Sequence, residues 1–281
     1  MREINVEEIT KLVERLCIES NYYLPQDVKK ALEHALDKEE SPLAMDILKD
    51  ILKNQEIART NNVPICQDTG LAVIFLELGQ EVRLVGGDLS EAIDEGVRRG
   101  YKNGFLRKSA VNDPFMVRKN TGDNTPAIVH TKIVPGEKVK IILAPKGGGS
   151  ENMSALAMLK PSDGVKGIKK FVIDSVEKAG SNPCPPIIVG IGIGGTIEKT
   201  TLIAKQALLR TVGEHNSNPQ VAKLEEELLE EINNLGIGPQ GFGGRSTALA
   251  VHIETFPAHI ASMPVAINIQ CHVARHQEAI L

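Results

Sequence analysis

The sequence predicts a mixed α/β fold in which an N-terminal helical layer is followed by mixed and antiparallel sheets packed with helices. Apolar residues recur at helical spacing through the first 60 positions, short apolar or β-branched runs follow, and helical patterns return between those runs. The 281 residues are enough for one large domain with an ample core. We therefore expect a single domain over residues 1–281, with residues 1–60 as its helical layer.

The helical layer is expected to contain three helices. Asn5 and Glu8 have the spacing of a capping box, and apolar residues follow them every three to four positions. Gln26–Leu36 predicts a second helix. Ser41 followed by Pro42 is typical of a cap and a first helical position, so a third helix is expected to begin there.

The rest of the chain is expected to alternate strands with helices. Strands are predicted over residues 71–78, 187–193, 247–256 and 264–270, and helices over 88–101, 164–179, 196–208 and 221–235. Residues 127–134 and 138–144 are separated by Pro-Gly-Glu, which is the sequence pattern of a β-hairpin. The acidic residues of the last helix are expected on a solvated face, and the five glycines within residues 236–245 indicate a mobile or ligand-facing loop.

Composition excludes several kinds of partner. The net charge is −4 and no block of Lys or Arg occurs, which argues against nucleic acid or an anionic membrane as a main partner. No segment reaches the roughly 18 apolar residues that a membrane span requires, and the first residues lack the pattern of a signal peptide. We expect a cytoplasmic protein, whose four cysteines remain reduced and do not form a disulfide framework.

Three of the four cysteines lie at the ends of predicted strands. Cys66 and Cys184 each stand beside or close to proline, and Cys271 directly follows the last predicted strand. The fourth, Cys17, falls on a helical apolar stripe and is expected in the core. The spacing lacks the close pairs of zinc sites. Three thiolates are one fewer than an iron–sulfur cluster usually has, and an iron without a protein ligand could bind substrate, but spacing alone leaves three unrelated buried cysteines as an open alternative.

Polar residues near these cysteines could act on a substrate. Asp68 could move protons beside a metal or could simply hold a turn. Arg107 could grip a carboxylate or be solvated, and His259 could contact a ligand or be a hydrogen-bonded histidine of the core. His272, Arg275 and His276 could support the residues that contact the ligand or could belong to a solvated chain end.

Glycine runs allow two further interpretations. In Lys146–Asn152, three successive glycines would let bare backbone approach a ligand. The glycines at positions 190, 192, 194 and 195 suggest a dinucleotide-binding turn. Their spacing departs from G-x-G-x-x-G, and a predicted helix occupies the place where an acidic residue should end a second strand. A nucleotide-binding oxidoreductase is therefore disfavoured.

Taken together, these motifs resemble the α subunits of class I (iron–sulfur) fumarate hydratases and of L(+)-tartrate dehydratases. The resemblance covers nearly the whole chain. It rests on Pro64–Gly70, Lys146–Asn152, Asn182–Pro186 and the segment around Cys271.

The resemblance implies a role for each of these motifs. Cys66, Cys184 and Cys271 would hold a [4Fe-4S] cluster with one open iron that binds substrate. Asp68 would transfer protons, and the substrate would be contacted by Gln67, Arg107, the Gly149 backbone and His259.

The implied function is that of an α subunit in a two-subunit hydro-lyase that reversibly hydrates fumarate to L-malate. Dehydration of L(+)-tartrate to oxaloacetate is the alternative within the same class, and a non-catalytic subunit with structural cysteines is the alternative from another class. Single-chain members of the family continue into a second catalytic domain, whereas this sequence ends ten residues after Cys271. A separate β subunit and a higher oligomer of α and β chains are therefore expected.

Overall fold

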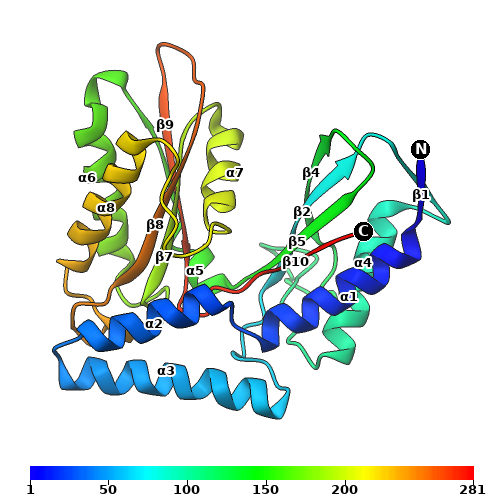
Figure 1. Ribbon diagram of the computed structural model, residues 1–281, viewed down its shortest axis with the longest axis horizontal. Helices are drawn as coiled ribbons and strands as arrows, with labels where there is room; N and C mark the ends of the chain where they lie inside the picture. The colour runs from blue at the N-terminus through cyan, green and yellow to red at the C-terminus, as the bar shows by residue number, and fades with distance from the viewer. The chain divides into compact units, whose positions relative to one another are not determined.

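The computed structural model describes residues 1–281 and divides them into two compact units (Figure 1). Unit 1 contains residues 1–24, 54–147 and 275–281, and unit 2 contains residues 25–53 and 148–274. Both units combine strands with helices, which confirms the mixed α/β class.

The three helices expected in the N-terminal layer are present but are shared between the units. Helix α1 (Val6–Tyr22) belongs to unit 1 and α2 (Gln26–Lys38) to unit 2, while α3 (Pro42–Asn61) begins in unit 2 and ends in unit 1. The capping box at the start of α1 is confirmed, because the Asn5 side chain accepts from the backbone of the first turn and Glu8 accepts from the Asn5 N–H.

Unit 1 is built on a four-stranded sheet with the order β10-β5-β2-β4. Strand β2 (Leu71–Gly79) is central, antiparallel to β5 (Val139–Lys146) and parallel to β4 (Ile128–Val134), and β10 (Gln277–Ile280) is antiparallel to β5. The expected hairpin between β4 and β5 is therefore wrong. Strand β2 is buried over most of its length, whereas β4 is largely exposed. The more buried strand, β2, therefore lies between β5 and β4, and β4 lies at the edge of the sheet.

Helices α1 and α4 (Leu89–Asn103) pack against each other and complete the core of unit 1. A short parallel pair, β1 (Arg2–Asn5) and β3 (Val82–Val85), adjoins them. Cys17 lies in this core, as expected, and a Cβ atom on Gly100 would lie only 2.6 Å from its Cβ. Burial raises the pKa of the Cys17 thiol far above its ordinary value, so this cysteine stays protonated and inert.

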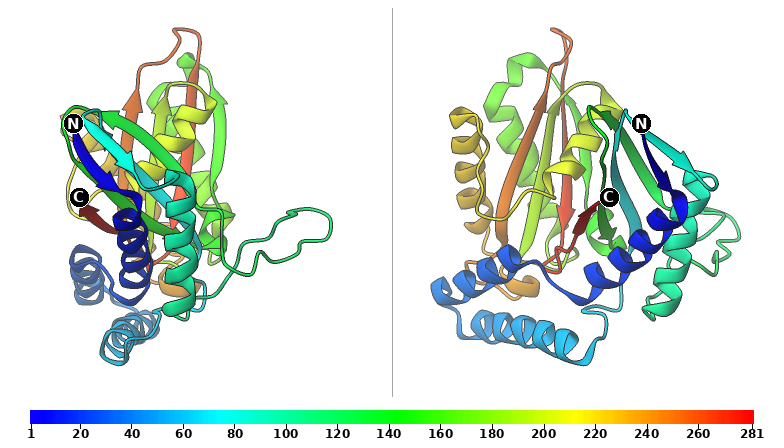
Figure 2. Two further views of the ribbon diagram at one scale, coloured as in Figure 1. Left: turned by 90° about the vertical axis from the view of Figure 1, so that its right-hand side faces the viewer. Right: turned by 45° about the vertical axis from the view of Figure 1, so that its right-hand side comes forward.

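A long loop, residues 104–127, joins α4 to β4 and projects from the rest of unit 1 (Figure 2, left). Its base is fixed by Asn124, which is fully buried. The Asn124 side chain accepts from the N–H groups of Ser109 (2.6 Å) and Ala110 (3.0 Å) and donates to the Gly70 carbonyl at 3.1 Å. The base of the loop is therefore tied to the start of β2.

Unit 2 is built on a second four-stranded sheet, with the order β6-β9-β7-β8. Strand β7 (Ile187–Gly194) is parallel to β8 (Ala248–Phe256) and antiparallel to β9 (Met263–Gln270), which also pairs with β6 (Ala155–Leu159). The buried strand expected over residues 187–193 is confirmed, because β7 is almost wholly enclosed.

Helices cover both faces of the unit 2 sheet (Figure 1). Helices α6 (Gly164–Ala179) and α8 (Pro219–Asn233) lie on one face, and α7 (Ile197–Ala207) lies on the other. The remaining short elements are α5 (Gly148–Glu151), η1 (Pro161–Asp163) and η2 (Pro239–Gly241).

The glycines of β7 allow α7 to approach the strand closely. A Cβ atom on Gly190 would lie 2.2 Å from the Ala204 carbonyl oxygen, and one on Gly192 would lie 2.1 Å from that of Thr200. Two of the four glycines that suggest a nucleotide-binding turn are therefore explained by helix–strand packing.

The expectation that the acidic residues of α8 are all solvated is wrong for Glu225. Its side chain is 2% exposed. The carboxylate pairs with Arg210 at 2.6 Å and accepts from the backbone N–H groups of Ile253 (2.6 Å) and Asn216 (2.9 Å). Glu225 thus joins the segment between α7 and α8 to the central part of β8.

Replacing Glu225 by alanine is expected to lower the free energy of unfolding by about 3–5 kcal/mol, because it removes one partner of a buried ion pair and leaves two backbone N–H groups without an acceptor. Urea unfolding followed by circular dichroism measures this loss. Glu226, its exposed neighbour on the same helix, is the matched control, and E226A should change the free energy of unfolding by less than about 0.5 kcal/mol. Equal effects of the two substitutions would contradict the assigned role of Glu225.

Candidate functional site

The proline-rich turn before β7 presents Cys184 at one end of the unit 2 sheet. The Cys184 N–H closes the turn by donating to the Ser181 carbonyl at 3.0 Å. Its φ of +56° is in the left-handed region, which is uncommon for a residue with a Cβ atom, and its side chain is exposed. Such conformations cost free energy and gather at functional sites, so this geometry favours a functional role for the thiol.

Cys271 lies at the same end of the unit 2 sheet as Cys184. Strand β9 runs antiparallel to β7, and its last residue, Gln270, pairs with Ile188 near the start of β7. The backbone N–H of His272 donates to the Cys184 carbonyl at 3.3 Å, and the Nδ1 atom of His272 lies 3.0 Å from the same oxygen. The structure therefore brings together the segments that carry two of the three candidate ligand cysteines.

Gln240, which the sequence did not single out, supports both of these segments. Its backbone N–H and its side-chain Nε2 each lie 2.8 Å from the Pro185 carbonyl, and Nε2 is also 3.1 Å from His272 Nδ1. A Cβ atom on Gly241 would lie 2.3 Å from that of Ser181. The glycine-rich loop expected to be mobile or ligand-facing is thus packed against the proline turn. Its glycines indicated tight turns, but no signal in the sequence identified the partner.

In unit 1 the loop before β2 carries Cys66 and Gln67. The backbone of Ile65 is held on both sides, because its N–H donates to the Asn21 carbonyl and its carbonyl accepts from the Asn54 side chain, each at 2.9 Å. Cys66 is half-buried and its thiol donates to Gln67 Oε1 at 3.1 Å, while Gln67 is exposed. The loop therefore fixes the backbone beside a thiol that is not enclosed in the core.

Asp68 follows in the same loop with an oriented carboxylate. Its Oδ1 atom accepts from the Gly70 N–H at 3.0 Å, and a Cβ atom on Gly147 would lie 3.0 Å from Oδ2. Its backbone carbonyl accepts from the Arg275 guanidinium. A half-buried carboxylate held in one orientation is suited to accept or deliver a proton.

Tyr101 holds the backbone that follows Asp68. Its hydroxyl lies 2.9 Å from both the Thr69 and the Gly70 carbonyl oxygens. Burial above all raises its pKa well above the ordinary value, the nearby Asp68 carboxylate raises it further, and the charge of Arg275 lowers it. The phenol is therefore a neutral, permanent hydrogen-bond donor to this loop.

Arg107 and Gly149 lie near different parts of the candidate site. The Arg107 side chain is exposed at the base of the projecting loop, and its carbonyl accepts from the Thr69 hydroxyl at 3.0 Å, which places it beside the Asp68 loop of unit 1. Gly149 belongs to α5 of unit 2, where an added Cβ atom would lie 3.4 Å from the Asn182 carbonyl, two residues before Cys184.

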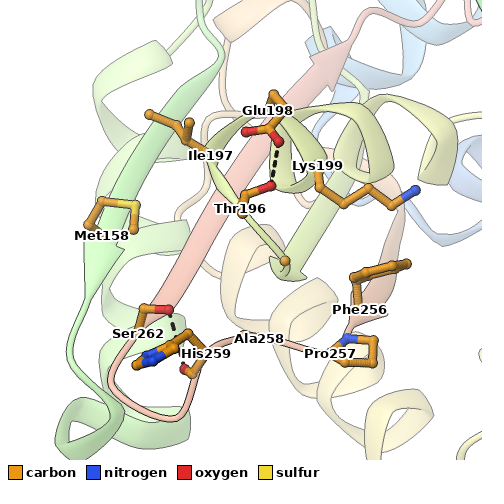
Figure 3. A pocket seen from close by; sticks show the side chains of 11 residues that line it. Met158, Thr196, Ile197, Glu198, Lys199, Phe256, Pro257, Ala258, His259 and Ser262 are labelled. Carbon is orange, nitrogen blue, oxygen red and sulfur yellow. Dashed lines mark hydrogen bonds between the residues drawn. The ribbon is translucent and has the colours of Figure 1, made fainter.

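His259 lies at the other end of the unit 2 sheet, in the loop that joins β8 to β9 (Figure 3). The interpretation of His259 as a core histidine is wrong, because its side chain is exposed, with Nδ1 accepting from the Ala261 N–H at 3.1 Å. It lines a pocket of about 850 Å³ together with Lys199 and Phe256. Strand β9, about 23 Å long at roughly 3.3 Å per residue, separates this loop from Cys271. Unit 2 therefore does not bring His259 to Cys184 and Cys271.

Besides Asn268 Oδ1 in unit 2, the buried polar side-chain atoms without a hydrogen-bond partner lie in unit 1. They belong to Asn21 (Oδ1), Gln55 (both side-chain amide atoms) and Arg275 (Nε and Nη1). The Asn21 carbonyl accepts the Ile65 N–H, and Arg275 donates to the Asp68 carbonyl. Gln55 directly follows Asn54, whose side chain donates to the Ile65 carbonyl. Buried polar groups are nearly always paired, so the Arg275 atoms leave hydrogen-bonding capacity beside the Asp68 loop that a further polar group can use.

None of the helices has both the length and the apolar character that crossing a membrane requires.

Comparison with known proteins assigns this chain to a family. The chain matches the family model described as fumarate hydratase (Fumerase) over residues 10–280. It is 46% identical over 272 residues to the "Putative L(+)-tartrate dehydratase subunit alpha" of Methanocaldococcus jannaschii, with 95% of each chain covered. It is 32% identical over 272 residues to the L(+)-tartrate dehydratase subunit alpha of Escherichia coli K12, covering 96% of this chain and 89% of the relative. The chain therefore belongs to the fumarate hydratase family.

Proposed function

We propose that this chain is the α subunit of an iron–sulfur hydro-lyase that dehydrates L(+)-tartrate to oxaloacetate. The observation that carries the proposal is the hydrogen-bonded pair of segments bearing Cys184 and Cys271 at one end of the unit 2 sheet. The names of the two relatives favour tartrate as substrate, although the motifs in the sequence led us to expect fumarate first. Reversible hydration of fumarate is the second candidate, favoured by the description of the matched family.

The residues present fit an iron–sulfur cluster. Thiolates are the ligands that hold such clusters, and the side chains of Cys66, Cys184 and Cys271 are half-buried or exposed, unlike the enclosed Cys17. The unpartnered N–H groups of Arg275 suit a site that gains negative charge. When bound by the three cysteines, the cluster would supply an open iron that acts as a Lewis acid toward the substrate hydroxyl.

Asp68 is assigned the proton transfer. Loss of water from tartrate takes a hydrogen from one carbon and a hydroxyl from its neighbour, and the resulting enol rearranges to oxaloacetate. We assign the proton to the Asp68 carboxylate, which is oriented by the Gly70 N–H at Oδ1 and by the close approach of Gly147.

The substrate carboxylates need separate partners. Gln67 is an exposed amide next to Cys66, Arg107 can form two parallel hydrogen bonds to a carboxylate, and the Gly149 backbone lies beside the Cys184 turn. The position of His259, a full strand length from Cys271, does not support a contact with a substrate that is bound beside the cysteines of the same chain.

A separate β subunit completes the proposed enzyme. Both relatives are described as subunit alpha. We assign to the β subunit the remaining carboxylate-binding groups and the second acid–base group, in a higher oligomer of α and β chains. The α chain alone should then show little or no activity.

Assay of the assembled complex tests the proposal. The chain is co-expressed with a candidate β subunit, purified without oxygen and supplied with L(+)-tartrate, fumarate or L-malate. The complex should form oxaloacetate from L(+)-tartrate with a higher kcat/KM than it shows for the other two acids, and D(−)-tartrate serves as the stereochemical control. The opposite order of kcat/KM would favour fumarate hydration. A cluster-loaded complex that is inactive on all of these acids would overturn both candidates.

A further inference from the structure

Arg275 is a buried cation for which the chain provides no anionic partner. The residue is 4% exposed. Its Nη2 atom donates to the backbone carbonyl of Asp68, which is a neutral acceptor. Its Nε and Nη1 atoms are buried and have no hydrogen-bond partner, and the guanidinium forms no ion pair.

A guanidinium in this situation is unfavourable unless something else supplies negative charge. Arginine does not lose its proton in proteins, so it cannot escape the desolvation cost by becoming neutral. The chain provides carboxylates for a less enclosed arginine, because the half-buried Arg210 contacts both Glu225 and Glu254. Arg275 is more deeply buried than Arg210 and has no such pair.

The surroundings of Arg275 point to the missing negative charge. Asp68, whose carbonyl it holds, comes two residues after Cys66 in the same loop of unit 1. The nearby phenol of Tyr101 is neutral, and the contact between Asp68 and Arg275 is made by the neutral backbone carbonyl of Asp68. The buried Nε and Nη1 atoms have no surface through which a dissolved substrate could reach them. The thiolate of Cys66, in the same loop of unit 1, remains as the source.

We propose that Arg275 is a positioning residue of the iron–sulfur site, which fixes the Asp68 backbone and balances the negative charge of the thiolate-ligated cluster. This inference rests on the proposed function, since it requires that a cluster binds. It goes beyond it by giving a role to a residue that contacts neither iron nor substrate. The neutral carbonyl of Asp68 sets the position of the guanidinium, beside the loop of unit 1 that carries Cys66.

The inference predicts opposite effects on the two forms of the protein. In the cluster-free chain the unpaired charge of Arg275 lowers the stability of the fold, because its burial costs desolvation free energy. R275M should therefore unfold at the same temperature as the unmodified chain or at a higher one. In the loaded chain the same substitution should speed cluster loss to an iron chelator about tenfold or more. It should also make the reduction potential of the cluster more negative, because a nearby positive charge favours the reduced form. R275K keeps the charge and should restore the potential.

The experiment uses the full chain, reconstituted without oxygen with iron and sulfide, and compares the unmodified protein with R275M, R275K and R210M. Iron and sulfide per chain, the rate of cluster loss, the potential followed by electron paramagnetic resonance, and the thermal unfolding of the cluster-free forms are measured. R210M is the matched control, because it removes a half-buried arginine that has its own carboxylates. It should destabilise the cluster-free chain and leave the potential unchanged.

Each outcome decides between the two proposals. An unmodified chain that takes up no iron or sulfide would overturn the proposed function and this inference together. A loaded unmodified chain whose potential and rate of cluster loss are matched by R275M would overturn the role of Arg275 alone. So would an R275M chain that fails to fold without the cluster, because the guanidinium would then stabilise the empty chain.

Discussion

Replacing Cys184 by serine is expected to abolish cluster binding, and with it the brown colour and broad visible absorbance of the reconstituted protein. Serine has nearly the same shape, and the turn is fixed by backbone contacts: the Cys184 N–H donates to Ser181, and the Cys184 carbonyl accepts from His272. The substitution therefore removes the thiolate and leaves its setting in place. Iron and sulfide per chain and the absorbance spectrum after anaerobic reconstitution measure the effect.

Cys17 provides the matched control for this substitution. It is enclosed in the unit 1 core with its pKa raised by burial, so it cannot act as a ligand. C17A should lower the stability of the chain by loosening its contact with Gly100, and should leave iron and sulfide content unchanged. A C184S chain that binds as much cluster as the unmodified chain would remove Cys184 from the ligand set.

Replacing Asp68 by asparagine is expected to lower kcat by about 10²- to 10⁴-fold, the usual contribution of a positioned proton-transfer group. The amide oxygen of asparagine can still accept the Gly70 N–H, so the turn and the backbone held by Arg275 should persist. The cluster content of D68N should therefore equal that of the unmodified complex. Steady-state kinetics of the complex, together with iron and sulfide analysis, separate lost chemistry from lost cluster.

Asp88 is a suitable control for D68N. Its Oδ1 atom also accepts a backbone N–H, that of Glu91, at the start of α4. Asparagine is as good a helix cap as aspartate, so D88N should keep both kcat and stability. Activity of D68N equal to that of D88N would show that the Asp68 carboxylate carries no proton in the reaction and would favour a non-catalytic role for the loop.

Local signals in the sequence predicted most of the individual elements. The capping box at Asn5, the Ser-Pro start of α3 and the apolar run of β7 act within a few residues, and each element forms where those signals place it. The pairing of strands follows a different logic. A Pro-Gly-Glu turn between two strands favours a hairpin, but β2, from about 50 residues earlier in the chain, displaces it because it buries more apolar surface.

The candidate site shows the same limit. The prolines and strand ends around Cys184 and Cys271 identified where chemistry could occur, and the structure brings those two segments together. Gln240 could not be found in this way, because its role depends on a loop that returns to Pro185 from 55 residues away. The buried Glu225 was hidden among exposed glutamates, since only the folded segment around Arg210 distinguishes it from them. His259 shows that closeness in sequence to a cysteine does not give closeness in space.

The order of residues in the two units has a consequence for biosynthesis. Residues 148–274 of unit 2 lie in the chain between β5 and β10, which pair in the sheet of unit 1. A ribosome therefore releases almost all of unit 2 before it releases the last strand of unit 1. During translation the later-made unit can finish folding first, while β5 waits with an open edge for the final residues of the polypeptide.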